Sequence, residues 1–104
     1  MNRRILTVVV ALMTIALPLL ADAAPDGAAV YKSKCAMCHG PDGAGQTPTG
    51  KALKVRDLRS AEVQKMNDKQ LNAVIANGKG KMPAFKTLSQ AEVDALIAFI
   101  RKLK

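Results

Sequence analysis

The apolar positions of this chain follow two patterns. Residues 5–20 form an almost unbroken apolar run, whereas in the remainder apolar residues recur every three or four positions, as in helices that bury one face. No convincing strand pattern lies between these helical stretches. The pattern therefore predicts several helices that each bury one face, preceded by an apolar leader.

The first predicted helix after the apolar run spans about residues 26–35. Asp26 can cap its start, and Gly27, Val30 and Tyr31 fall on one of its faces. A glycine near the start of a helix costs stability unless another backbone must come close to it. The pattern therefore predicts a tight crossing with another helix at Gly27.

Three further helices are predicted from their end signals. A short one spans about residues 60–66, and Asn67 with Gln70 three positions later marks the start of the next, which Gly78 ends. The Ser-Gln-Ala-Glu sequence at 89–92 is a capping box that opens the last helix. The apolar faces of the last two helices carry Leu71, Val74 and Ile75, and Val93, Leu96, Ile97, Ile100 and Leu103.

The leader has the three parts of a secretory signal peptide. A basic start, with Arg3 and Arg4, precedes the apolar run, and Ala21-Asp22-Ala23 gives the small-x-small pattern of a cleavage site. An uncleaved membrane anchor is the alternative, but the run of 16 residues is shorter than the ~20 that span a bilayer. We therefore expect a signal peptide at residues 1–23, cleaved after Ala23, and one domain at residues 24–104.

The composition of this domain indicates an incomplete apolar core. After cleavage it has 81 residues, a size at which a core alone is only marginally stabilising. Its aromatic residues are Tyr31, Phe85 and Phe99, with no tryptophan. A large bound apolar group would complete such a core.

The charge of the domain bears on its partners. Removing residues 1–23 takes away Arg3, Arg4 and Asp22 and leaves a formal charge of +7. A basic surface speeds encounters with acidic partners, and nucleic acid or an anionic membrane surface are the alternatives. The lysines are dispersed rather than clustered with aromatic residues, and the export signal argues against nucleic acid. We therefore expect acidic protein partners and no nucleic acid.

The residues that carry chemistry are concentrated in Cys35-Ala36-Met37-Cys38-His39. Two cysteines separated by two residues can form thioethers with the two vinyl groups of a haem, and the adjacent histidine can then ligate the iron. The pattern therefore predicts one covalently bound haem c, attached through Cys35 and Cys38, with His39 as the proximal ligand.

Three other uses of the cysteine pair agree less well with the sequence. A redox dithiol is expected near a strand-helix-strand pattern, which is not evident here. A zinc site needs about four ligands, and the domain has two cysteines and one histidine. A disulfide across two residues would be strained and would close almost no loop. Haem attachment is favoured, with dithiol chemistry as the main alternative.

The second axial ligand is expected among the three methionines of the domain. Met37 lies inside the attachment motif and cannot reach the other face of the ring, and Met66 has a helical context in which methionine is usually core filler. Met82 lies in a glycine-rich loop closed by Pro83, which can hold its sulfur over the iron. Met82 is therefore the predicted ligand. The side chains placed to replace its sulfur are Lys79 and Lys81.

The segment from Gly40 to Arg59 is predicted to be a loop. Glycine and proline occupy six of the eleven positions from 40 to 50, which is dense turn chemistry. A loop of this kind could wrap the edge of a haem. The end of the segment is basic and either neutralises the propionates or forms a solvated face; its cations are Lys51, Lys54, Arg56 and Arg59.

These residues together resemble the class I c-type cytochromes, in particular the small bacterial periplasmic ones. The resemblance covers the whole domain and rests on Gly27 and Tyr31, the motif at 35–39, the loop at 77–85, and Leu96 with Phe99. It implies an all-α cytochrome c fold, with three main helices plus loops wrapped around one covalently bound haem. In this fold the first and last helices cross where their glycine and aromatic meet the apolar pair.

Two further features of the family concern the haem surroundings. The family has a proline carbonyl that orients the proximal histidine, and Pro48 is the best match for it. Many members place a tryptophan near a propionate, and this chain has no tryptophan. The resemblance therefore does not supply a hydrogen-bond donor for the propionates.

The function implied by the resemblance is one-electron transfer outside the cytoplasm, in the periplasm. With His39 and Met82 filling both axial positions, no site is left for oxygen or peroxide, and no enzymatic activity is expected. One alternative is a dedicated electron-delivering subunit of a dehydrogenase or oxidase complex, and a less favoured one is a haem sensor or enzyme with a labile sixth ligand. The implied partners are redox proteins with acidic docking surfaces, and the mature chain is expected to be a monomer without stable membrane insertion.

Overall fold

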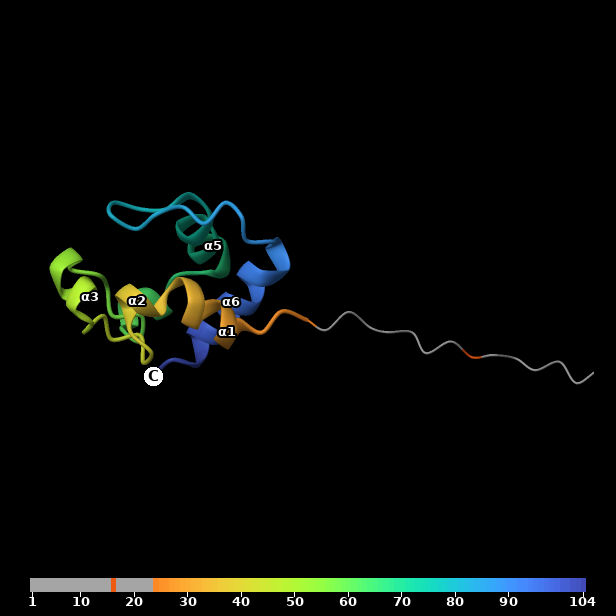
Figure 1. Cartoon of the computed structure of the whole chain (residues 1–104), viewed down its shortest axis with the longest axis horizontal. Coiled ribbons are helices and arrows are strands. Elements are labelled where there is room, and N and C mark those ends of the chain that lie inside the picture. The colour runs from red at the N-terminus through yellow and green to blue at the C-terminus, as the bar shows by residue number, and fades with distance from the viewer. Residues whose placement is uncertain (1–15, 17–23) are drawn as a thin grey trace, which may run out of the picture.

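The computed structural model describes Ala16 and residues 24–104, and over the latter the chain forms a helical domain (Figure 1). The predicted signal peptide, residues 1–23, lies outside the described residues except for Ala16. In chain order the helices are α1 (Gly27–Lys34), α2 (Ala36–His39), α3 (Pro48–Leu53), α4 (Ala61–Gln64), α5 (Asp68–Asn77) and α6 (Gln90–Lys102).

No strand occurs among the residues that the structure describes. Their β-type pairing is limited to an isolated antiparallel bridge between Lys79 and Met82. Within the same part of the chain, no helix combines the length and the apolar character needed to cross a membrane. The all-α class that the family resemblance implies is confirmed.

Side chains cap the longer helices where the sequence predicted. Asp26 accepts a hydrogen bond from the N–H of Ala28 at 3.0 Å, so that α1 begins directly after it. Helix α5 ends at Gly78, whose φ of 76° suits a residue without a side chain. Capping boxes open α5 and α6 at the predicted pairs, Asn67 with Gln70 and Ser89 with Glu92.

Helices α1 and α6 cross at Gly27, as the sequence predicted. A Cβ atom on Gly27 would overlap the carbonyl oxygen of Ala95 and would lie 2.7 Å from its carbonyl carbon and 3.2 Å from Cβ of Phe99. One turn further along α1, the ring of Tyr31 packs on Phe99 with centroids 4.7 Å apart. The closest approach of α6 is therefore its own backbone at Ala95, while Leu96 lies fully buried beside it.

The core lies between α1, α5 and α6. The apolar faces predicted for the last two helices are largely confirmed, although Val74 and Leu103 are only partly buried. The buried cluster consists of Tyr31, Val63, Leu71, Ile75, Val93, Leu96, Ile97 and Ile100. This small cluster does not fill the domain, because a cavity adjoins it.

The prediction that residues 40–59 form a loop is wrong over α3. Thr47 caps this helix through a 2.9 Å hydrogen bond from the N–H of Gly50 to its hydroxyl, and Pro48 occupies the first turn. Gly50 is buried, because the carbonyl oxygens of neighbouring segments leave no space for a Cβ atom. Pro48 and Gly50 therefore belong to a short, closely packed helix rather than to a turn.

Candidate functional site

A cavity of about 470 Å³ opens between α2 and the loop that follows α5. The two elements lie apart in Figure 1, and residues from both line the cavity. Its lining is mainly apolar and comes also from α4, α5 and α6. The predicted site residues that the structure brings to this one cavity are Cys35, Cys38, His39 and Met82.

The two cysteines lie on consecutive helical turns. Cys35 ends α1, and its carbonyl oxygen accepts hydrogen bonds from the N–H of Cys38 at 3.2 Å and of His39 at 2.9 Å. Both thiols are free and half-buried. This short turn therefore carries two thiols and one imidazole along the same cavity wall.

The electrostatics of the thiols argue against dithiol redox chemistry. Burial, with a smaller contribution from Cys38, raises the pKa of the free Cys35 thiol to about 11. Thiol–disulfide exchange requires a thiolate, and catalytic CxxC pairs therefore hold a lowered pKa. The environment of Cys35 has the opposite effect.

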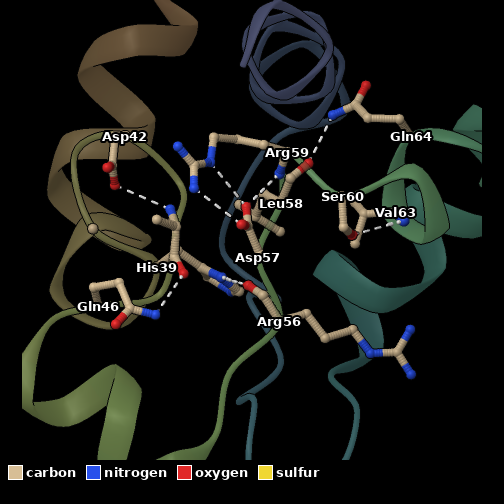
Figure 2. Close-up of polar contacts among 12 residues, drawn as sticks. His39, Asp42, Gln46, Arg56, Asp57, Leu58, Arg59, Ser60, Val63 and Gln64 are labelled. Carbon is tan, nitrogen blue, oxygen red and sulfur yellow. Dashed lines mark hydrogen bonds and ion pairs between the residues drawn. The ribbon is translucent and has the colours of Figure 1, made fainter. Parts of the chain in front are cut away.

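His39 is held by a backbone carbonyl. Its Nδ1 lies 3.1 Å from the carbonyl oxygen of Arg56 (Figure 2). A carbonyl can only accept, so Nδ1 carries the proton and donates, which leaves Nε2 with a free lone pair. Burial lowers the pKa of His39, opposed by this hydrogen bond. Burial therefore favours the neutral ring, which is the form that ligates iron.

The expectation that Pro48 orients the proximal histidine is wrong. Pro48 is exposed and opens α3, whereas the carbonyl that meets His39 belongs to Arg56. The sequence singled out Arg56 only for its positive side chain. A carbonyl acceptor exists at every residue, so no residue type in the sequence could have marked this one.

The loop after α5 holds Met82 in place. The N–H of Met82 donates to the carbonyl of Lys79 at 2.9 Å, and the reverse bond is 3.1 Å. A Cβ atom on Gly78 would lie 2.6 Å from the Met82 carbonyl oxygen, so the start of the loop requires a glycine. The N–H of Phe85 then donates to the carbonyl of Ile75 and ties the loop to α5.

The other two methionines have different environments. Met37 is 76% exposed and is not part of the cavity lining. Met66 lines the cavity from the segment between α4 and α5 and packs partly against the core. The structure thus brings Met66 and Met82 to the same cavity and leaves Met37 outside it.

Basic side chains also line the cavity. Of the predicted basic stretch, Lys54 and Arg56 line the cavity, Lys51 lies in α3 outside the lining, and Arg59 is paired with Asp57 by a 3.0 Å ion pair. Arg56 itself forms a 2.7 Å ion pair with Glu62. The cations of the lining are Lys34, Lys54, Arg56, Lys79 and Lys81.

The residues of this cavity fit a covalently attached haem. Its volume lies within the ~300–1,000 Å³ typical of cofactor pockets. The wall offers two thiols, a neutral imidazole with a free nitrogen and a thioether, and its apolar lining suits a porphyrin. The cations provide counter-charges for carboxylates such as propionates.

Comparison with known proteins identifies the family. Residues 22–100 match the family described as cytochrome c oxidase, cbb3-type, subunit III. Cytochrome c6 of Leptolyngbya boryana is 37% identical over 81 residues, which are 77% of this chain and 91% of that protein. The chain belongs to the class I c-type cytochromes.

Further relatives support the assignment of this chain to the c-type cytochromes. Cytochrome c6 of Nostoc sp. is 34% identical over 97 residues, 88% of this chain and 82% of that protein. The solved structure of the KustC0563 c-type cytochrome superposes with a TM-score of 0.69 at 35% identity and covers 77% of this chain and 99% of that one. The predicted cytochrome c fold, covalent haem c and electron-carrier function are therefore confirmed.

Proposed function

We propose that this cytochrome is an exported one-electron carrier in which Cys35 and Cys38 hold the haem covalently and His39 and Met82 bind its iron. The observation that carries the assignment is the convergence of these four side chains on one apolar cavity. The neutral His39 ring supports it further, because the hydrogen bond from Nδ1 to Arg56 leaves Nε2 free.

The chain's own groups determine the redox behaviour. When bound, the haem supplies an iron centre that changes by one electron between ferric and ferrous states. The imidazole of His39 donates electron density through Nε2, and the soft thioether of Met82 favours the reduced state. The apolar side chains around the cavity limit solvation and so disfavour the more highly charged oxidised state.

A closed coordination sphere supports a carrier rather than an enzyme. With His39 and Met82 both holding the iron, no position would remain for oxygen or peroxide. Two of the relatives named above are cytochromes c6. We therefore assign no catalytic residue to this chain.

The charge distribution supports acidic redox partners. Five cations line the cavity, and the chain has 16 lysines and arginines against 8 acidic residues. Such a surface favours encounters with acidic proteins, with rates that fall as salt screens the charges. We propose a periplasmic monomer that acts after removal of residues 1–23, in line with the leader sequence.

One purified sample tests this assignment. The protein is produced in a bacterial host that attaches haem c, and its mass is measured together with its reduced-minus-oxidised spectrum. A mass equal to residues 24–104 plus one haem is expected, with a far-red sulfur–iron band in the oxidised spectrum. Rapid binding of carbon monoxide by the parent protein would instead indicate an open sixth position and contradict the carrier assignment.

A further inference from the structure

Gln64 joins two distant segments beside the candidate haem site. It is the last residue of α4, and its side chain is half-buried. Its amide nitrogen donates to the carbonyl oxygen of Leu58 at 2.7 Å (Figure 2) and to that of Ile100 at 3.1 Å. Both hydrogens of the amide are therefore used to hold Leu58 against the end of α6.

The bond to Leu58 fixes the segment that meets His39. The N–H of Val55 donates to Gly50 at 3.0 Å, and the N–H of Leu58 donates to Gly43 at 2.8 Å. Between these two points lies the carbonyl of Arg56, the acceptor for His39 Nδ1. The Leu58 carbonyl, two residues after Arg56, is held by its hydrogen bond from Gln64.

The ion pair that this segment forms through Arg56 restrains it less strongly than the hydrogen bond from Gln64. The ion pair of Arg56 with Glu62 is at the surface, where the two side chains are 50% and 70% exposed. Exposed ion pairs contribute little because water and salt screen them. The half-buried amide of Gln64 is costlier to disrupt, since its loss removes two hydrogen bonds and leaves the Leu58 carbonyl without the partner that it has here.

Arg101 secures Gln64 in turn. Its guanidinium donates to the carbonyl oxygens of Gln64, at 3.0 Å, and of Met66, and it pairs with Asp68 at 2.8 Å. The end of α6, the end of α4 and the segment around Arg56 are thereby joined by hydrogen bonds. Leu58, which Gln64 holds, follows Arg56 by two residues.

We propose that Gln64 is a positioning residue that sets the strength of the hydrogen bond from His39 to Arg56 and, through it, the reduction potential. The inference rests on the proposed role of His39 as iron ligand. A firm Nδ1–H···O=C bond makes an imidazole ligand more basic and favours the oxidised iron. Loosening the acceptor weakens that bond and shifts the potential toward more positive values.

The test compares the parent holoprotein with Gln64→Met, which keeps the length of the side chain and removes both donors. In the reduced, diamagnetic protein, the His39 Nδ1–H proton is followed by NMR. We expect it to exchange with solvent about tenfold faster in the variant, the ratio for a loss of about one hydrogen bond. The potential measured by voltammetry should become more positive.

Ile97→Val is the matched control, because it removes one methylene from a buried residue outside the cavity lining. It should lower stability while leaving the exchange rate and the potential at parent values. If Gln64→Met behaves like Ile97→Val in both readouts, Gln64 is only structural and the proposal fails. If Gln64→Met does not fold, Gln64→Asn, which cannot span both carbonyls, carries the test with smaller shifts in the same direction.

The parent protein separates this inference from the proposed function. If the parent spectrum shows no covalent haem, or NMR shows that His39 does not bind the iron, the proposed function itself fails. If the parent shows both and the Gln64 variants leave the proton exchange and potential unchanged, the ligand assignment stands and the role of Gln64 is overturned.

Discussion

Two methionine side chains, Met66 and Met82, line the cavity from different kinds of backbone. Met66 follows a helix and packs partly against the buried core. Met82 also packs partly against the core, but it lies in a loop that two hydrogen bonds with Lys79 close, and this loop holds its thioether at the cavity. This difference makes Met82 the better candidate for a ligand and Met66 the better candidate for a filler.

Met82→Ala should leave the haem attached and lower the reduction potential, because the soft ligand is lost. The sulfur–iron band should disappear, and the iron should bind water, Lys79 or Lys81 instead. Added cyanide or carbon monoxide should then bind quickly, whereas the parent should bind them slowly. Optical spectra and voltammetry of the two proteins measure these changes.

Met66→Ala is the control for that substitution. It removes a partly buried side chain and should destabilise the fold through a cavity, by about 2–5 kcal/mol if the site is well packed. Its ligand field should be unchanged. Loss of the sulfur–iron band in Met66→Ala, together with its retention in Met82→Ala, would exchange the roles of the two methionines.

At the scale of single residues, the sequence predicts which side chains form the site but not which backbone carbonyl accepts a hydrogen bond from them. The cysteine spacing and the glycines around Met82 were sufficient to predict which side chains meet at the cavity. The partner of His39 was assigned to Pro48, yet the structure places the carbonyl of Arg56 there. The path of the folded chain decides which carbonyl lies next to His39. Side-chain type therefore could not predict it.

Helices α1 and α6 depend on each other at their crossing. The first has only 8 residues, too few to be stable in isolation. Its backbone approaches Ala95 so closely that a side chain at Gly27 has no space. The identity of one residue therefore determines whether the two helices can pack at this distance.

Gly27→Val should destabilise the fold by about 1–3 kcal/mol or more, because the added carbon atoms overlap the backbone of Ala95. Ala29→Val is the control, since Ala29 is an exposed residue of the same helix and reports only the change in helix propensity. Denaturant midpoints of the two variants compare the costs. Equal midpoints would show that the crossing tolerates a side chain.

The capping box of α6 gives a pH-dependent prediction. The pKa of Glu92 lies below its ordinary value, chiefly because the N–H of Ser89 donates to its carboxylate. A depressed pKa stabilises the fold above the unfolded value and loses that effect as pH falls through the folded value. The stability advantage of the parent over Glu92→Gln should therefore be present at neutral pH and vanish in acid. Thermal melts across this range measure the difference, and a constant difference would contradict the linkage.

Helix ends were predictable where the signal is local. Asn67 with Gln70 and Ser89 with Glu92 form the capping boxes that the sequence indicated. Helix α3 was missed, because Pro48 and Gly50 are turn residues by type. In the structure Pro48 begins the helix and Gly50 packs closely against the backbone of neighbouring segments. The contact at Gly50 depends on those segments and could not be predicted from residue type.

At the scale of the whole molecule, the haem is part of the fold. The cavity of about 470 Å³ opens to water and is mainly apolar, so a haem that fills it covers apolar surface, which stabilises by about 25 cal/mol per Å². A small domain is stable by only about 5–15 kcal/mol in total. The bound group that fills this space therefore accounts for much of the stability of the chain.

Cys35→Ala combined with Cys38→Ala should yield a chain without covalent haem, because the protein has no other cysteine. Acid–acetone extraction should then remove any haem. The extracted chain should lose most of its helical signal in circular dichroism, since the apolar walls of the cavity have nothing to pack against. Met37→Ala is the matched control: it changes an exposed residue between the two cysteines and should keep both haem and helix. Haem that resists extraction from the double variant would refute attachment through these cysteines, and a haem-free chain that stays helical would show that the core is sufficient without it.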